Sequence, residues 1–423
     1  MGMTISEKLL AQASGRERVQ PGEIVSPNPE LVIVHDGYLE TAYEQLKEIG
    51  YRSIANPERV MVVTDHNVIQ VTPKAIERSR ANRRIAAEWK VGQFFDVGRG
   101  GHGHIYPMEA GFVKPGMFLF AYDMHCTNFG SIGAFALRAG PDIPVVLATG
   151  TIWTIVPETL RVDLVGKYRP GVHPRDLGFR LSADLTSGKH GVEFDHRVVE
   201  FGGEVVDAMP VPERIALCNT LTEIGVNNVM FPPMRMDGST DIPDAVRSDP
   251  DARYESRLTL DLTDLEPQVA LPGGPDRAVG VGEAAGRSVD QAFLGSCGSG
   301  MYEDFKLAAG LLRGRKIAPN VRFYVVPGTV AVAKRLADEG IAQQFMEAGA
   351  MFLPAGCGPC TGGVGAPLGP GEVSISTAAT NSTGRMGSKE ADCYLASPIT
   401  VTESAVAGCI VDPRHADQAV TTH

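Results

Sequence analysis

The sequence predicts an α/β protein with more than one sheet. Short runs of β-branched and aromatic residues recur along the chain, and such runs are typical of strands buried on both faces of parallel or mixed sheets. Segments with helical periodicity and one polar face lie between them. The expected strands are Leu31–Val34, Val60–Val63, Met117–Phe120, Ala292–Leu294 and Met351–Leu353, and the expected helices are 40–49, 73–90 and 330–348.

Length and composition limit the possible functions. The chain has 423 residues, and at about 150 residues per domain this predicts about three domains. A net charge of −11 disfavours nucleic acid as the main partner, because phosphate binding needs a basic face. No apolar stretch is long enough for a membrane span, and no secretory leader is evident. The seven scattered cysteines fit a reducing compartment, so we expect a cytoplasmic protein.

Several apolar runs end in residues that can carry out chemistry. A single histidine at the end of a strand is more often a hydrogen-bonded structural group than a catalyst. Here, however, three runs each deliver a histidine with a carboxylate, and two more deliver cysteines. Ligands gather at the carboxyl ends of parallel strands, so these residues predict a shared site. They are His35 with Asp36, Asp65 with His66, Asp123 with His125, and the cysteines Cys297, Cys357 and Cys360.

The stretch Cys357-Gly358-Pro359-Cys360 has the C-x-x-C spacing of either a metal cluster or a redox disulfide. A redox motif needs a helix after the first cysteine, but residues 361–367 hold three glycines and a proline. Cys297 lies in a similar turn of small residues. Three cysteines in glycine-lined turns predict an iron–sulfur cluster. A four-cysteine electron-transfer cluster is the alternative, with its fourth ligand among Cys126, Cys218, Cys393 and Cys409.

The segment from Gly98 to Gly103 matches G-x-G-x-x-G, the dinucleotide-binding pattern. That pattern requires a helix directly after the glycines. Pro107 falls where this helix should continue, so we do not expect a nucleotide site here.

Motifs spread over nearly the whole chain match one family. They are Glu7-Lys8, Ser14-Gly15-Arg16, Pro21-Gly22, Thr149-Gly150, Pro157-Glu158-Thr159, Cys218-Asn219, Glu223, Ser296-Cys297, Glu303-Asp304, Cys357-Gly358-Pro359-Cys360, Thr383-Gly384-Arg385 and Ser397-Pro398. With them the chain resembles the aconitase superfamily of cluster-dependent hydro-lyases, and within it the large subunits of isopropylmalate dehydratase and the related homoaconitases.

The resemblance implies three α/β domains around a central iron–sulfur cluster, at residues 1–190, 191–285 and 286–423. It also implies that Cys297, Cys357 and Cys360 bind a [4Fe–4S] cluster whose fourth iron has no protein ligand. That iron would act as a Lewis acid on the hydroxyl group of a hydroxy-acid substrate.

The same resemblance implies roles for further residues. The family uses histidine–carboxylate pairs for proton transfer, and we expect His66 to be the acid. A further histidine is His102 or His104, of which we favour His104. The implied catalytic residues are Asp65, His66, His104, Asp123, His125 and Glu223, and the implied substrate-binding residues are Asn219, Ser296 and Arg385.

One part of the family's machinery is not in this sequence. The base that removes the proton from carbon is a serine in a Gly-Ser-Ser-Arg context on a swivelling domain, and the chain lacks that motif. The resemblance therefore implies a separate small subunit that supplies the serine, with no role for nucleic acid or a membrane.

Three positions depart from the family pattern. Met124 replaces a serine, Gly298-Ser299 replaces Thr-Asn, and Thr380 replaces an arginine. Losing a cation at a buried carboxylate costs about 2 to 5 kcal/mol. We therefore expect a different or smaller hydroxy-acid, such as a citramalate, a substituted malate or a maleate-type compound. A non-catalytic cluster-binding protein and a C-x-x-C thiol oxidoreductase are the alternatives.

Overall fold

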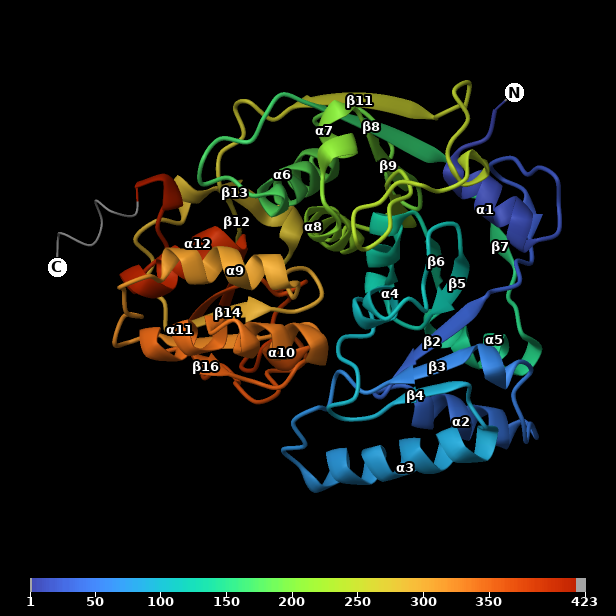
Figure 1. Cartoon of the computed structure of the whole chain (residues 1–423), viewed down its shortest axis with the longest axis horizontal. Coiled ribbons are helices and arrows are strands. Elements are labelled where there is room, and N and C mark those ends of the chain that lie inside the picture. Colours follow the sequence, from blue (N-terminus) through green and yellow to red (C-terminus); the bar gives the residue numbers. More distant parts are fainter. Residues whose placement is uncertain (1, 416–423) are drawn as a thin grey trace. The chain divides into compact units, whose positions relative to one another are not determined.

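A computed structural model describes residues 2–415 (Figure 1). The chain folds as an α/β protein with parallel and mixed sheets, which confirms the predicted fold class. Its contacts divide it into two compact units, each built from three separate segments. Unit 1 comprises Met1–Leu164, Glu193–Val211 and Gly225–Leu260, and unit 2 comprises Val165–Val192, Pro212–Ile224 and Asp261–His423. The three-domain boundaries given above stay a prediction.

The first sheet of unit 1 is parallel, with the strand order β4-β3-β2-β5-β6. Every residue of β2, β3 and β5 is buried, as expected for apolar runs covered on both faces. Helices α2 and α3 pack together, and their apolar side chains join those of the sheet in one core. The elements are β2 (Leu31–His35), α2 (Leu39–Glu48), β3 (Val60–Val63), α3 (Pro73–Trp89), β4 (Gln93–Phe95), β5 (Phe118–Ala121), β6 (Phe135–Arg138) and α5 (Ile143–Thr149).

Unit 1 also contains most of a four-stranded sheet with the order β10-β9-β8-β11. Strand β9 pairs in parallel with both β8 and β10. A separate antiparallel pair joins β1 to β7. The elements are α1 (Ile5–Ala13), β1 (Ile24–Val25), β7 (Thr154–Ile155), β8 (Thr159–Val165), β9 (Val198–Gly202), α7 (Glu204–Ala208), β10 (Asn228–Met230) and β11 (Ser256–Asp261).

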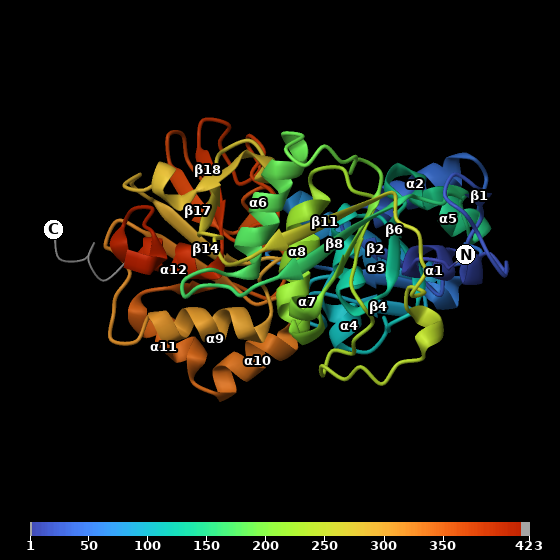
Figure 2. The same cartoon turned by 90° about the horizontal axis from the view of Figure 1, so that it is seen from above.

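The sheet of unit 2 has seven strands in the order β13-β12-β18-β17-β14-β15-β16. Strand β14 pairs in parallel with β15 and β17, whereas β12 is antiparallel to both neighbours. Helices α9, α10 and α11 lie together on one side of this sheet (Figure 2). The strands are β12 (Gln268–Ala270), β13 (Ala278–Gly280), β14 (Gln291–Gly295), β15 (Arg322–Val326), β16 (Met351–Phe352), β17 (Val373–Ser376) and β18 (Asp392–Ala396). The helices are α6 (Pro174–Thr186), α8 (Val211–Thr222), α9 (Tyr302–Leu311), α10 (Val330–Asp338), α11 (Ile341–Ala348) and α12 (Pro398–Ala407).

The expectation of a single helix over 330–348 is wrong. The segment forms two helices, α10 and α11, because Gly340 has a φ of 73°. This left-handed conformation ends one helix and starts the next, and glycine adopts it without a steric penalty. Among residues 2–415, no helix is both long enough and apolar enough to span a bilayer.

Gly130 provides a test of the packing in unit 1. It lies in the 3-10 helix η2 (Met124–Ile132), and a Cβ atom there would lie 1.7 Å from the carbonyl oxygen of Val229 in β10. We expect Gly130→Ala to lower the free energy of unfolding by about 1 to 3 kcal/mol, because the backbone must move to make room. Chemical denaturation followed by circular dichroism measures this change.

The control is Gly310→Ala in α9, where a Cβ atom meets open space. That substitution should raise the free energy of unfolding by about 0.4 to 1 kcal/mol, because it restricts the unfolded chain. Equal effects of the two variants would contradict the packing argument.

Candidate active site

The predicted site residues fall into two groups, one in each unit. The group in unit 1 follows from the order of the strands. Strands β2, β3 and β5 are neighbours and run parallel, so their carboxyl ends meet at one edge of the sheet. His35 ends β2, Asp65 follows β3, and Asp123 follows β5. The sequence pattern therefore brings these residues to a common edge.

Asp65 is the centre of this group. Its side chain is fully buried, and it accepts hydrogen bonds from His66 Nδ1 at 2.6 Å and from His35 Nδ1 at 3.0 Å. The backbone N–H of Gly103 donates a third at 2.7 Å. Burial alone would raise the pKa of Asp65, but the charges of His35 and His66 outweigh burial and hold this pKa well below its usual range. Asp65 is therefore a carboxylate at neutral pH.

The pKa of His66 is shifted upward, in the opposite direction to that of Asp65. Burial alone would lower its pKa, but the charge of Asp65, the hydrogen bond to it and the charge of Asp36 raise the pKa of His66 to about 9. Asp36 also holds the backbone here, since its Oδ1 accepts the N–H groups of Asp65 at 3.2 Å and of His66 at 3.0 Å. His66 is therefore protonated at neutral pH, with Nδ1 committed to Asp65.

Asp123 forms a second centre at the start of η2. Its Oδ1 accepts both the backbone N–H and the Nδ1–H of His125, each at 2.9 Å. His104 Nε2 lies 3.8 Å from the same oxygen. Burial would raise the pKa of Asp123, but the charge of His125 and the hydrogen bond to it bring the pKa well below its usual range. This carboxylate orients the His125 ring, as expected for a positioned proton carrier.

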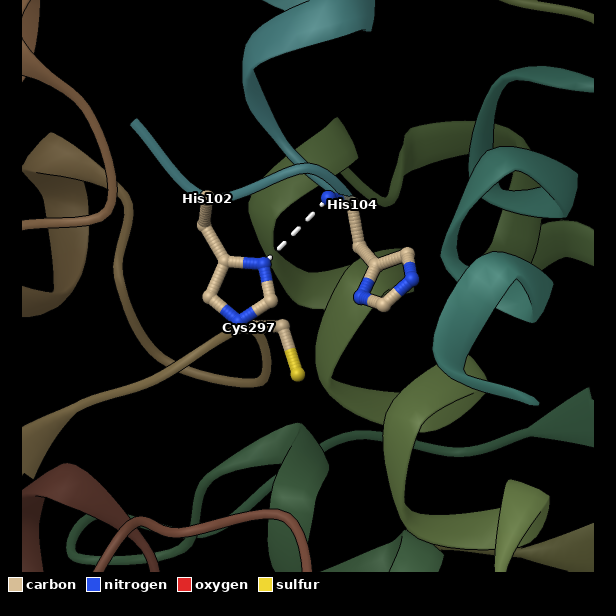
Figure 3. A group of neighbouring side chains, drawn as sticks. All are labelled: His102, His104 and Cys297. Atoms are coloured by element: carbon tan, nitrogen blue, oxygen red, sulfur yellow. Dashed lines mark hydrogen bonds between the residues drawn. The ribbon is translucent and has the colours of Figure 1, made fainter. Parts of the chain in front are cut away.

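His102 and His104 lie in the same loop and are both buried. The backbone N–H of His104 donates to His102 Nδ1 at 3.3 Å (Figure 3). His102 Nδ1 lies 3.5 Å from Asp65 Oδ2, so His102 belongs to the Asp65 centre and His104 to the Asp123 centre. Burial lowers the pKa of His102 to about 4 and that of His104 well below its usual value. Both rings are neutral at neutral pH.

His35 was expected in the shared site because it ends an apolar run, but it was not among the predicted catalytic residues. Its ring is fully buried between the two centres, hydrogen-bonded to Asp65 and 4.5 Å from the His104 ring centre to centre. The signal for His35 was the same strand-end pattern that identified Asp65 and Asp123. His35 and Asp36 thus form the structural support of the group in unit 1.

The glycine-rich segment 98–103 has a structural role in place of nucleotide binding. Only a four-residue helix, α4 (Tyr106–Glu109), follows it. Gly103 donates to Asp65, and a Cβ atom on Gly103 would lie 2.5 Å from His35 Cε1. The glycine is therefore required by the close approach of the backbone to the Asp65 centre.

The cysteines lie in unit 2, in two turns after strands. Cys297 follows β14, and the residue before it, Ser296, has a left-handed φ of 72°. Cys357 directly precedes the short 3-10 helix η7 (Gly358–Cys360), and Cys360 is its last residue. The three thiols belong to residues that are 2 to 4% exposed. Thr361 is extended after η7, so no helix continues from the C-x-x-C motif, as the sequence predicted.

The other predicted residues of unit 2 are placed as follows. Asn219 is fully buried on α8, and its Nδ2 donates to Cys297 Sγ at 3.1 Å. Ser296 Oγ lies 3.7 Å from the same sulfur. Glu223 comes directly after α8, one turn beyond Asn219. Arg385 is half-buried in the segment between β17 and β18.

The departure at Gly298 has a structural reason. A Cβ atom there would lie 2.2 Å from Arg175 Nη1 and 2.3 Å from Asn219 Oδ1, so no side chain fits at this position. Arg175 could not be identified from the sequence, because its signal is only that it precedes the buried Phe179 by four residues on α6. Nothing in the structure explains the departures at Met124 and Thr380.

Three buried thiols in tight turns, with an amide N–H directed at one sulfur, fit a thiolate-bound iron–sulfur cluster. Comparison with known proteins then identifies the family. A sequence profile of the aconitase family (aconitate hydratase) matches residues 7–408. The chain belongs to the aconitase family.

The similar proteins include 3-isopropylmalate dehydratase large subunit 1 of Methanopyrus kandleri, which is 39% identical over 98% of this chain and 99% of its own length. The probable methanogen homoaconitase large subunit of Methanothermobacter thermautotrophicus is 36% identical over 97% of this chain and 98% of its own. These matches confirm the resemblance stated above and indicate an aconitase-family hydro-lyase.

Among solved structures, the aconitase X of Thermococcus kodakaraensis in its holo-form is similar, with a TM-score of 0.52 and 13% identity. The match covers 91% of this chain and 95% of that chain. At this low identity it supports the aconitase-like fold alone.

The shifted pKa of His66 predicts how stability depends on pH. Its folded pKa of about 9 lies above its unfolded value of about 6.5, so its contribution to stability is complete below about pH 6.5 and is lost as the pH rises through 9. The difference in unfolding free energy between the natural protein and His66→Asn should therefore shrink across this interval. Urea unfolding from pH 6 to pH 9.5 measures it.

The exposed His196 is a matched control, since its side chain is 86% exposed and asparagine tolerates its left-handed backbone. For His196→Asn the difference should stay small at every pH. A His66→Asn difference that grows with pH would contradict the ion pair with Asp65.

Proposed function

We propose that this chain is the catalytic large subunit of a [4Fe–4S]-dependent hydro-lyase. It would dehydrate, hydrate or isomerise a hydroxy di- or tricarboxylic acid of the isopropylmalate, citramalate or substituted-malate type. The observation that carries the proposal is His66, a buried imidazolium held protonated by Asp65. Elimination of a hydroxyl group needs a proton for the leaving oxygen, and a protonated histidine supplies one at neutral pH.

Cys297, Cys357 and Cys360 are the residues that would hold the cluster. When bound, a cluster with three protein ligands supplies a Lewis-acidic iron for the hydroxyl group of the substrate. The buried thiols support this assignment, because iron–sulfur clusters take thiolate ligands and sites shielded from water. Asn219 would support the site through its hydrogen bond to Cys297 Sγ.

His66 would donate its proton from Nε2. Its Nδ1 is bound to Asp65, so Nε2–H is the proton that is free to leave. After transfer, the ring remains hydrogen-bonded to Asp65 through Nδ1–H, which keeps it oriented for the reverse reaction. His35 and Gly103 donate to Asp65 as well, which stabilises its charge in both states.

The Asp123 centre would position polar parts of the substrate and its water. His125 is oriented by Asp123, and His104 is held neutral by burial, so His104 can accept or donate a hydrogen bond without a charge. In unit 2, Glu223 would take part in proton transfer, and Ser296 and Arg385 would bind the substrate. Of these, Arg385 has the guanidinium fork that suits a substrate carboxylate.

A separate small subunit would provide the base for the carbon-bound proton. The sequence has no Gly-Ser-Ser-Arg motif, and the similar proteins reported above are named as large subunits. We therefore propose a partner whose swivelling domain supplies a catalytic serine. Thr380, which is neutral where the family pattern has an arginine, supports a substrate other than isopropylmalate.

The cluster assignment makes a first prediction. Cys357→Ala should lower the iron and sulfide content and remove the visible absorption after anaerobic reconstitution, because it deletes one of three ligands. Cys409→Ser is the control, since this half-exposed cysteine lies outside the proposed site, and its iron content should be unchanged. Full iron content in Cys357→Ala would contradict the assignment.

The proton-transfer assignment makes a second prediction. Asp65→Asn should lower kcat by about 100-fold or more and move the alkaline limit of activity to lower pH, because His66 loses the charge that raises its pKa. Kinetics of the two-subunit complex from pH 6 to pH 10 measure both effects. Asp96→Asn is the control, because it removes a partly exposed ion pair with Arg83. It should change neither kcat nor the alkaline limit of activity.

Substrate assays with the same complex test the reaction itself. Isopropylmalate, citramalate, malate derivatives and the corresponding maleates form the panel, with loss or gain of the alkene absorption as the readout. Turnover of a smaller hydroxy-acid is expected. Turnover of isopropylmalate alone would overturn the substrate proposal, and a cluster-loaded complex inactive on the whole panel would favour a non-catalytic role.

A further inference from the structure

Arg175 is a buried cation that the proposed mechanism does not use. It lies in the first turn of α6 in unit 2 and has no solvent exposure. Its Nη2 donates to the carbonyl oxygen of Ala378 at 2.5 Å, but Nε and Nη1 have no hydrogen-bond partner within residues 2–415. A buried charge with unsatisfied donors is costly, so such a group needs an explanation.

No carboxylate explains it. Within the part of the chain that the structure describes, Arg175 makes no ion pair. Two buried carboxyl groups, Asp304 and Asp176, interact electrostatically with Arg175, but burial raises the pKa of Asp304 to about 8 and that of Asp176 to about 7. Asp304 accepts a hydrogen bond from the backbone N–H of Met301, and Asp176 accepts one from the backbone N–H of Gln268. Among residues 2–415, the guanidinium therefore has no carboxylate within hydrogen-bond or ion-pair distance.

The space beside Arg175 is bounded by the cysteine turn. A Cβ atom at Gly298 would fall 2.2 Å from Arg175 Nη1 and 2.3 Å from Asn219 Oδ1, so both atoms border the same small space next to Cys297. The other end of the Asn219 amide donates to Cys297 Sγ. Phe179, whose ring lies 5.1 Å from the guanidinium, packs in the same buried cluster as Cys297 and Cys360.

The charges agree with this geometry. The thiols of Cys297 and Cys360 are among the groups that interact electrostatically with Arg175, where they oppose the effect of burial. Arg175 thus carries a positive charge that acts on two of the three proposed sulfur ligands, and two of its N–H donors have no partner among residues 2–415.

We propose that Arg175 is a positioning residue that compensates the negative charge of the thiolate-bound cluster and, with Asn219, donates hydrogen bonds to its sulfur atoms. This inference rests on the proposed function. It also accounts for Gly298, because any side chain there would occupy the space into which Arg175 Nη1 and Asn219 project. Arg175 does not contact the reacting atoms and is not a catalytic residue.

The charge on Arg175 has a measurable consequence. Net charge and hydrogen bonds to sulfur are two of the factors that set the reduction potential of an iron–sulfur cluster. A cation nearby favours the reduced form, which carries one more negative charge, so its removal should lower the midpoint potential. Loss of groups that support metal ligands also weakens metal retention, commonly by about 10- to 100-fold.

The experiment compares Arg175→Gln and Arg175→Lys with the natural large subunit, each co-expressed with the small subunit and reconstituted anaerobically. The readouts are the midpoint potential from an EPR-monitored redox titration and the rate of iron release to a chelator. Arg175→Gln should lower the potential and release iron about 10- to 100-fold faster. Arg175→Lys keeps the charge and should recover most of the potential.

Two further variants separate a local effect from a general loss of folding. Arg180→Gln, on the same helix, removes a half-exposed ion pair with Asp184 and should leave both readouts unchanged. Gly298→Ala keeps the charge but fills the space beside Nη1, and should speed iron release. If Arg175→Gln fails to fold, Gly298→Ala still tests the proposal.

The outcomes distinguish this inference from the function on which it rests. A natural complex that takes up no cluster would overturn the proposed function, and this inference with it. A natural complex with a cluster, and variants that melt at lower temperature but keep its potential and iron release, would overturn this inference alone.

Discussion

Unit 1 depends on the hydrogen bonds that the buried carboxylate of Asp65 accepts. A carboxylate with no solvent exposure is stable only when its oxygens are paired, and here two imidazoles and one backbone N–H supply the donors. Each donor imposes a requirement on the chain. His35 must end β2, His66 must follow β3, and residue 103 must be a glycine so that the loop comes close enough.

In unit 2 the corresponding constraint comes from three buried cysteine thiols. Its cysteines lie in tight turns, and within these turns Ser296 and Gly358 both have the left-handed backbone conformation with positive φ. Asn219 is a buried polar side chain next to the first of these turns. It donates a hydrogen bond to the thiol of Cys297. A thiol is a weak hydrogen-bond acceptor, whereas a thiolate is a strong one. The Asn219 amide is therefore suited to a negatively charged sulfur.

The sequence predicted the fold class and the strands well, because apolar runs of four or five residues identify strands covered on both faces. It also predicted which residues share a sheet edge, since the parallel order places strand ends together. It could not predict the break at Gly340, because the apolar periodicity continues on both sides of that residue. Arg175 was missed for a different reason. A charged residue in a helix normally lies on the solvated face, and only the packing of α6 shows that this one is buried.

The interleaving of the two units has a consequence for how the protein is made. The chain passes from one unit to the other after residues 164, 192, 211, 224 and 260. On the ribosome, unit 1 therefore has all of its segments once residue 260 has emerged, whereas unit 2 must wait for the C-terminal segment. Its thiols leave the exit tunnel on a unit that is still incomplete. With the cluster proposed above, unit 2 would be loaded at a stage when unit 1 already has all of its segments.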